Sequence, residues 1–380
     1  MRMVRTWIRS LGRVSIPRIA LVVVCCCFML ILTTNMDIGE GIFKFVRVRR
    51  CTDNTVSEAS EFRTSTDITS HGDRKHIHRQ SLIENVTSSN KYDVTVVTAY
   101  FDLGTFRKGS VTQFSTETYL SWCNTFRYLL NPLIVYTDSQ KFYHLMKNIR
   151  NDTANRTRIH LINRNSSWAF QLRSNISKVF SQKGYPKHYP NTVLPEYACA
   201  QLAKYDVISR ASRDDVFKTN YVMWLDVGYF RDRKSTNFFS LRRPKGYNES
   251  RVAMNVIQAN TNMAMPVTDI FRNNLVWVGG GLVFANRDII PRFETQLKKA
   301  VDYFLSRRVM NTDQQVVYAL FSDEGRRGIR PNIELQLYTP PGDKCWFYLG
   351  NIMLNSTNNI HTTQQILVYV ILTCIYLTNK

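Results

Sequence analysis

From residue 92 onward, short apolar runs alternate along the chain with segments in which apolar residues recur at helical spacing. The runs of strand length are Val94–Tyr100, Pro132–Tyr136, Tyr221–Leu225 and Val276–Asn286. The helical spacing covers Phe114–Leu130, a segment that begins at Pro195, and Phe293–Phe304. Strands that alternate with helices are typical of a largely parallel sheet covered on both faces. The pattern therefore predicts an α/β fold, a mostly parallel sheet flanked by helices.

Two helix starts carry their own signals. Proline is favoured at the first helical position, so Pro195 is expected to open a helix. The apolar face of that helix would be formed by Ala198, Leu202, Tyr205 and Ile208. Thr312 and Gln315 have the spacing of a capping box, which predicts a helix that begins between them.

The N-terminal region has a different pattern. Ile19–Leu32 is an unbroken apolar run, and its softer continuation to Met36 gives about the length that spans a thin bilayer. Five arginines precede the run, and no clear small-residue cleavage site follows it, which favours an uncleaved signal anchor over a cleaved signal peptide. We predict a cytosolic N-terminus at 1–18, a transmembrane signal anchor at 19–36 and a polar stem at 37–90.

The remaining chain would then lie in the lumen of the secretory pathway. We predict a single-pass type II membrane protein of the Golgi or endoplasmic reticulum, with a folded domain at 91–350. A tail at 351–380 would contain a short apolar segment, Ile366–Leu377, which is a buried strand, a weak tail anchor or a gene-model artefact. Asparagine sequons of the N-x-S/T type favour a lumenal location. They begin at Asn85, Asn151, Asn155, Asn165, Asn175, Asn248 and Asn355.

Charge narrows the range of partners. Lysine and arginine number 50 against 29 acidic residues, which gives a formal charge of +21. Such a balance suits polyanions, anionic membrane surfaces or phosphorylated substrates. The secretory anchor argues against nucleic acid as the partner. Outside the membrane run the cysteines are few and show neither zinc spacing nor a disulfide framework.

Asp226 is the first candidate for chemistry. It follows the strand Tyr221–Leu225, and open α/β sheets bind ligands beyond the carboxyl ends of their strands. Its carboxylate could bind a divalent cation that holds a diphosphate, or accept a hydrogen bond from a ribose or sugar hydroxyl. The alternative is that Asp226 only caps the next turn.

The segment that follows the first strand is the second candidate. In a doubly wound sheet this loop commonly contacts a nucleotide, so Thr98, Tyr100 and Asp102 are expected to line one. Arg107, together with Lys108, could meet phosphate charge. A core strand followed by a solvated basic loop is the alternative, and no dinucleotide fingerprint is present.

Two further positions lie downstream. Gly279–Gly281 permits close backbone approach, which would let Gly280 face a donor sugar, and Trp277 offers a ring for a sugar to stack on. A β-bulge is the alternative explanation of the glycines. Asp313 could contact an acceptor hydroxyl, or it could simply be an acid placed favourably at a helix N-terminus.

The order of these elements resembles glycosyltransferases of the GT-A type, and residues 92–350 resemble the HtrL/YibB-like family more closely. The resemblance is carried by Val96–Gly104, Tyr119–Trp122, Asn131–Asp138, Pro195–Tyr197 and Trp224–Tyr229. It implies a GT-A-like, nucleotide-diphospho-sugar transferase fold and a role in surface-glycan assembly. Gly228 stands where an Asp-x-Asp metal motif has its second acid, so a requirement for Mn²⁺ or Mg²⁺ at Asp226 is doubtful.

These observations converge on a glycosyltransferase of the secretory pathway. It would move a sugar from a nucleotide-sugar donor to a glycan or glycoprotein acceptor, with no catalytic base identified. The alternatives are a non-catalytic carbohydrate-binding protein on the same fold, favoured by the missing second acid, and a protein that binds acidic glycans through its positive charge.

Overall fold

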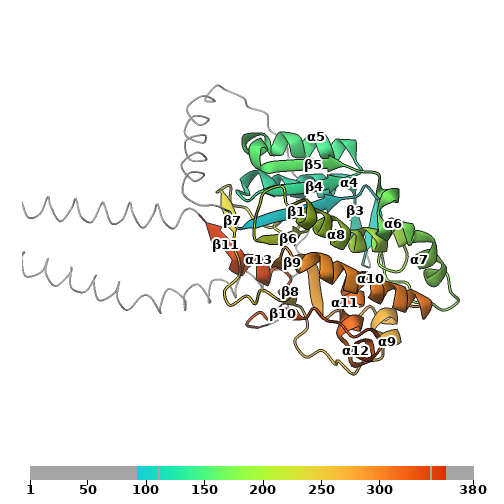
Figure 1. Ribbon diagram of the computed structural model, residues 1–380. Coiled ribbons are helices and arrows are strands. Elements are labelled where there is room, and N and C mark those ends of the chain that lie inside the picture. Colours follow the sequence, from blue (N-terminus) through green and yellow to red (C-terminus); the bar gives the residue numbers. More distant parts are fainter. Residues whose placement is uncertain (1–91, 110–111, 343–344, 357–380) are drawn as a thin grey trace, which may run out of the picture. The chain divides into compact units, whose positions relative to one another are not determined.

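A seven-stranded mixed sheet forms the centre of the computed structural model, which describes residues 92–109, 112–342 and 345–356 (Figure 1). Its strand order is β10-β8-β9-β6-β1-β4-β5. The strands are β1 (Val94–Tyr100), β4 (Leu133–Thr137), β5 (Thr157–Leu161), β6 (Tyr221–Leu225), β8 (Val252–Val256), β9 (Val278–Asn286) and β10 (Leu335–Tyr338). Only β9 runs antiparallel to its neighbours in this sheet. The predicted mostly parallel α/β fold is therefore confirmed.

Helices cover both faces of the sheet. One hydrophobic core lies under α6 (Trp168–Gln171), α7 (Arg173–Phe180), α8 (Pro195–Asp214), α9 (Val267–Arg272), α10 (Ile290–Ser306) and α11 (Asp313–Phe321), with α12 (Asp323–Ile329) following α11. The second core lies under α4 (Thr116–Trp122), the 3-10 helix η1 (Cys123–Tyr128), α5 (Gln140–Ile149) and α13 (Tyr348–Met353). Val96 and Val97 of β1 are both fully buried and face opposite cores, as strand alternation requires.

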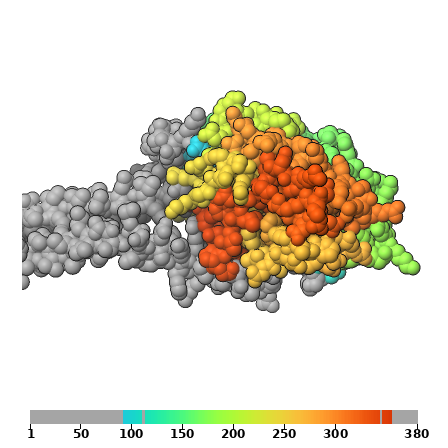
Figure 2. Space-filling view, turned by 60° about the horizontal axis from the view of Figure 1, so that its bottom comes forward, coloured from blue at the N-terminus to red at the C-terminus, as the bar shows by residue number. Residues whose placement is uncertain are grey.

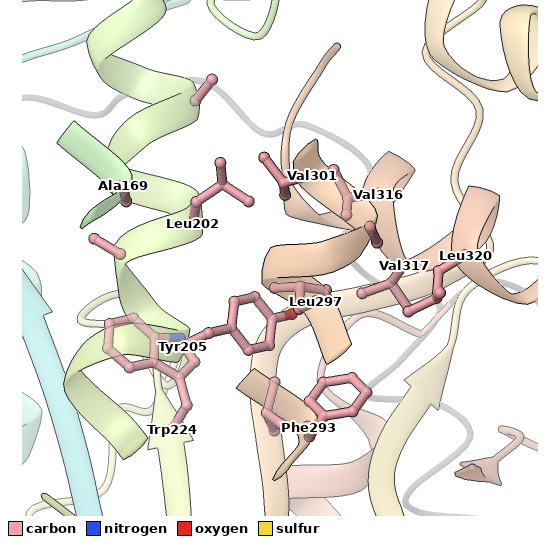
Figure 3. Packing of buried hydrophobic residues seen from close by; sticks show 14 of the residues in the cluster. Ala169, Leu202, Tyr205, Trp224, Phe293, Leu297, Val301, Val316, Val317 and Leu320 are labelled. Atoms are coloured by element: carbon pink, nitrogen blue, oxygen red, sulfur yellow. The ribbon is translucent and has the colours of Figure 1, made fainter. Parts of the chain in front are cut away.

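The helices of the larger core follow the sequence pattern. Pro195 is at the start of α8, whose predicted apolar face is buried, and the periodic residues of α10 are buried as well. Figure 3 shows Leu202 and Tyr205 of α8 directed toward Leu297 and Val301 of α10. The packing of α8 against α10 holds α8 next to the carboxyl ends of β1 and β6.

Three expectations need correction. The helix predicted over Phe114–Leu130 is only α4 followed by η1. The helix after Thr312 begins as predicted, but the hydroxyl of Thr312 donates to Oε1 of Gln315 (2.8 Å) and makes no cap to the backbone. The predicted domain boundary at 350 falls inside α13, after which β11 (Leu354–Ser356) pairs with β7 (Phe239–Leu241).

The pairing of β8 with β9 is irregular at the glycines. Met254 pairs with Val283, whereas the next residue, Asn255, pairs with Gly279. The segment Gly280–Leu282 therefore has no register partner on β8, while Leu282 still pairs with Leu225 of β6. The β-bulge considered from the sequence is present.

All of these elements lie in one compact unit, and Figure 2 shows a face of it built largely from the C-terminal half of the chain. The predicted N-terminus (1–18), signal anchor (19–36), stem (37–90) and terminal apolar segment lie outside the described residues. Within the part that the structure describes, no helix has the length and apolar character needed to cross a bilayer. Cys345 takes part in a disulfide, whereas Cys123 and Cys199 are buried free thiols.

Candidate functional site

A cavity of about 610 Å³ opens at the carboxyl ends of β1 and β6, next to the N-terminal half of β9. Its walls come from these strand ends, the hairpin β2–β3 (Phe106–Lys108 and Thr112–Phe114), α4, α8, the start of α11 and the segment before α13. This is the edge at which open α/β sheets bind their ligands. The size and the mixed polar and aromatic lining suit a small-molecule ligand.

Asp226 projects its carboxylate into this cavity. Its backbone N–H donates to Gly281 O (2.9 Å), which fixes the end of β6 against β9, and its own carbonyl accepts from Tyr229 N (2.9 Å). Oδ1 accepts a hydrogen bond from Trp224 Nε1 (2.6 Å), and the side chain remains 42% exposed. Backbone groups form the turn, while the carboxylate accepts from the indole of Trp224 and remains partly exposed to the cavity.

Lys204 lies on α8 beneath Asp226 and is buried. Its Nζ donates to Gly280 O (2.8 Å), pairs with Asp313 Oδ2 (3.0 Å) and lies 3.9 Å from Asp226 Oδ1. Asp313 is itself buried, and Tyr205 donates to its Oδ2 (3.3 Å). Burial raises the pKa of the Asp313 carboxyl, while the ammonium of Lys204 opposes that rise.

Asp313 does not line the cavity. It lies behind Gly280, where a Cβ would overlap Asp313 Oδ2 and stand 3.0 Å from Lys204 Nζ. The acceptor contact expected of Asp313 is therefore not offered by this geometry, in which the carboxylate holds Lys204. Glycine is required at position 280 because the ion pair occupies the space of a side chain.

Two further cations line the cavity. Lys108 is exposed on its wall, yet surrounding protein atoms lower the pKa of its ammonium, while Asp226 raises it and Arg231 and Lys204 lower it further. Arg231 is also exposed and donates through Nη1 to Gly228 O (3.1 Å). Neither Lys108 nor Arg231 forms an ion pair with a described residue, so both charges are available to an anionic ligand.

Gly228 is enclosed by an aromatic ring. A Cβ at this position would lie 2.5 Å from Cε3 of Trp122, so no acidic side chain fits there without moving the indole. Arg231 lies over the same ring, 5.3 Å from its centroid. The position of the second acid in an Asp-x-Asp motif is thus closed by Trp122, and Asp226 is the only carboxylate among the described residues that line the cavity.

The loop residues predicted to bind a nucleotide are only partly brought together. Tyr100 lines the cavity, whereas Thr98 is fully buried and its hydroxyl has no hydrogen-bond partner among the described residues. Asp102 is used by its own loop, because Oδ1 accepts from Gly104 N (3.1 Å) and from Thr116 Oγ1 (3.0 Å). Arg107 stacks over Tyr189 (4.4 Å), so Lys108 reaches the cavity in its place.

The aromatic residue expected to face a sugar is also a different one. Trp277 is buried against Tyr318 and Phe321, and it is part of the core. Trp346 lines the cavity instead and is 46% exposed. The other aromatic residues of the lining are Tyr100, Phe101, Phe106, Phe114, Tyr119, Trp122, Tyr189, Tyr197, Trp224, Tyr229 and Phe347. No sequence signal separates Trp346 from Trp277, because burial decides between them.

Among the described residues, the cavity itself supplies few ligands for a divalent metal. Among the described residues no group of three histidine, cysteine or acidic side chains is arranged to hold a metal ion. Asp226 offers one carboxylate, one oxygen of which accepts from Trp224 and lies 3.9 Å from an ammonium. Hard cations take about six or more oxygen ligands, so a cation at Asp226 would take most of its ligands from a bound diphosphate and water.

A family model described as "Bacterial protein of unknown function (HtrL_YibB)" matches residues 92–324, which is more than half of the chain. The match begins just before β1 and continues into α12, so it covers most of the cavity walls. No curated protein matches the chain significantly.

Proposed function

The chain belongs to the HtrL/YibB family, and on that premise we propose that it is a glycosyltransferase. It moves a sugar from a nucleotide-sugar donor to a glycan or glycoprotein acceptor. The observation that carries the proposal is one cavity in which Asp226 meets the unpaired cations Lys108 and Arg231 beside aromatic walls. A nucleotide sugar combines these needs, since it has a flat base, a diphosphate and a hydroxyl-rich ring.

Each part of the cavity has a proposed role. The base packs among the aromatic side chains at the end of β1, where Tyr100 lies. The diphosphate is bound by Lys108 and Arg231, whose charges stabilise the leaving group as the bond to the sugar breaks. Asp226 accepts a hydrogen bond from the acceptor hydroxyl and takes its proton as the hydroxyl oxygen attacks the anomeric carbon. Lys204 is a positioning residue, because its buried ammonium orients Asp226 and the carbonyl of Gly280.

Under this proposal the transfer needs no divalent cation. Diphosphate departure requires neutralisation by a metal or by basic side chains, and here basic side chains line the cavity while the metal ligands do not assemble. A Mn²⁺ or Mg²⁺ cofactor, considered from the sequence, is therefore not part of the proposed reaction.

Localisation in the secretory pathway is part of the same proposal. The five sequon asparagines whose side chains are described are all exposed, at Asn151, Asn155, Asn165, Asn175 and Asn248. The disulfide at Cys345 suits an oxidising compartment. Both observations support a lumenal domain held by the N-terminal anchor, a type II arrangement in the Golgi or endoplasmic reticulum.

The test is ligand binding by the full-length chain. Thermal shift with UDP, GDP and ADP, each with EDTA or with Mn²⁺, should show one nucleotide that raises the melting point equally in both conditions. A ligand at a hundred times its Kd stabilises the folded state by about 2.7 kcal/mol. No stabilisation by any nucleotide would refute a nucleotide-sugar site, and stabilisation that requires Mn²⁺ would refute the metal-free reaction.

Asp226→Asn then tests the chemistry. It keeps the shape of the side chain but removes its charge, so transfer should fall by about a hundredfold while nucleotide binding survives. The matched control is Asp232→Asn, since Asp232 is an exposed acid that does not line the cavity. Equal activity in the two variants would exclude Asp226 from the reaction.

A non-catalytic carbohydrate-binding protein is the second candidate. One observation favours it, namely that Asp226 is the only carboxylate among the described lining residues. A nucleotide-binding chain that releases no nucleoside diphosphate from any nucleotide sugar would support this candidate over the transferase.

A further inference from the structure

Trp346 is an exposed aromatic residue in a rigidly held segment. Its side chain is 46% exposed, yet both of its neighbours are fixed. The carbonyl of Cys345 accepts a hydrogen bond from the buried Asn255 (2.7 Å), and Cys345 is disulfide-bonded. The ring of Phe347 packs 5.1 Å from that of Tyr229. The indole is therefore held at the cavity wall without being buried.

The position of Trp346 relative to β9 is informative. A Cβ on Gly279 would lie 3.8 Å from Trp346, and a Cβ on Gly281 would lie 3.4 Å from Oδ2 of Asp226. Trp346 and Asp226 therefore both adjoin the glycine segment of β9.

The strand order shows where Trp346 lies relative to Asp226 and to the end of β1. β6 lies between β1 and β9, so the end of β1, Asp226 and the glycines of β9 follow one another across the sheet. Trp346 lies beside Gly279, on the far side of Asp226 from β1. A nucleotide at the end of β1 would leave the region next to Trp346 for the second substrate.

The ring of Trp346 also makes no aromatic or cation–π contact with the described residues. None of the ring contacts or cation–ring contacts among the described residues involves Trp346, whereas the exposed Tyr189 is covered by Arg107. Amide side chains that also line the cavity, including Gln314 and Asn274, supply hydrogen-bonding groups of the kind that sugar hydroxyls use. The cavity thus offers an aromatic face together with amide groups.

We propose that Trp346 is the platform of an acceptor subsite, on which a sugar ring of the acceptor glycan stacks with its attacking hydroxyl turned toward Asp226. This inference rests on the proposed transferase function for the direction of the reaction. The occupant follows from the geometry, since the flat face of a sugar ring covers the indole while its hydroxyls reach the amides. Trp346 binds acceptor and takes no part in nucleotide binding.

The test uses the detergent-solubilised full-length chain on a printed array of neutral and acidic glycans, with and without the stabilising nucleoside diphosphate. Wild type should bind one class of glycan, and Trp346→Ala should weaken that binding about tenfold or more, as expected for a central aromatic contact. Trp346→Phe should retain most of it. Leu337→Ala is the control, because Leu337 is a comparably exposed apolar residue, 41% exposed, that does not line the cavity.

The possible outcomes test the acceptor platform and the transferase proposal separately. Normal glycan binding by Trp346→Ala, or no glycan binding by wild type, overturns the platform. Loss of glycan binding together with loss of the nucleotide-induced thermal shift also overturns it, because the substitution has then disturbed the whole cavity. Glycan binding that depends on Trp346 in a chain that binds no nucleotide supports the platform and refutes the transferase, so the two proposals fail separately.

Discussion

Replacing Lys204 with methionine should leave the buried carboxylate of Asp313 without its charged partner. Lys204 and Asp313 have 2% and 1% exposed side chains and are 3.0 Å apart. Removal of one partner of a buried ion pair costs about 3–5 kcal/mol, because the other charge is left without compensation. The carbonyl of Gly280 would lose its donor as well. A typical domain has only about 5–15 kcal/mol of stability, so the Lys204→Met variant should be marginally folded.

The second substitution should restore most of the loss. In the double variant Lys204→Met/Asp313→Asn, no charge is buried and the amide can still accept the hydrogen bond from Tyr205. Replacing both members of a buried pair is often close to neutral. Urea unfolding of the full-length protein, followed by tryptophan fluorescence, measures all three free energies of unfolding. The control is Lys141→Met, whose 60% exposed side chain pairs with the 71% exposed side chain of Glu117 (2.5 Å) and should contribute less than about 1 kcal/mol.

The pH dependence gives an independent check. Burial raises the folded-state pKa of Asp313 above its ordinary value of 3.8, and removing Lys204 raises it further. The folded state then binds the proton more tightly than the unfolded state. The deficit of Lys204→Met should therefore be complete above the raised pKa and disappear as the pH falls below 3.8. The buried pair would be refuted if the Lys204→Met variant were as stable as the Lys141→Met control, or if the double variant were no more stable than Lys204→Met.

Two further predictions concern the charge of the cavity and the compartment. Although Lys108 is solvent-exposed, desolvation by surrounding protein atoms lowers the folded-state pKa of its ammonium below 10.5. Its charge is therefore lost at a lower pH than that of a free lysine, and nucleotide affinity should fall in the alkaline range. Lys108→Arg should keep affinity over that range, and identical profiles would exclude Lys108 from the phosphate site. The exposed sequons at Asn151 and Asn248 predict that endoglycosidase lowers the apparent mass of the chain expressed in a secretory cell, and an unglycosylated soluble product would contradict the lumenal topology.

Four of the seven strands of the sheet were predicted because their signal is local, whereas β5, β8 and β10 were not predicted. Val94–Tyr100 and Tyr221–Leu225 are continuous apolar runs, and the structure has β1 and β6 with the same bounds. The helix predicted over Phe114–Leu130 failed for a reason that lies elsewhere in the chain. Arg150 is buried and donates to the carbonyl oxygens of Phe126 and Leu129, so these groups are satisfied outside a regular helix. The spacing of apolar residues within Phe114–Leu130 does not show that the guanidinium of Arg150 will bind these carbonyl groups.

The site was predictable only in part, for the same kind of reason. Asp226 could be located because its position at a strand end is a property of the local sequence and the fold class. Whether Asp313 and Trp277 line the cavity depended on which residues, distant in the sequence, cover their side chains. Asp313 meets Lys204 from another helix, and Trp277 packs under Tyr318 and Phe321. Whether a side chain faces a cavity or a core is decided by tertiary packing, which a single sequence does not show.

Gly228 stands where an Asp-x-Asp motif has its second acid, and the structure shows what a glycine allows at this position. The space that a side chain at 228 would take is filled by the indole of Trp122. That ring in turn supports Arg231, which lies over it at 5.3 Å and is fixed by its hydrogen bond to the carbonyl of Gly228. An aspartate there would add negative charge and call for a metal, whereas glycine admits a ring that presents a permanent cation. In the proposed reaction, Arg231 thus stabilises the diphosphate where an Asp-x-Asp motif would use a metal.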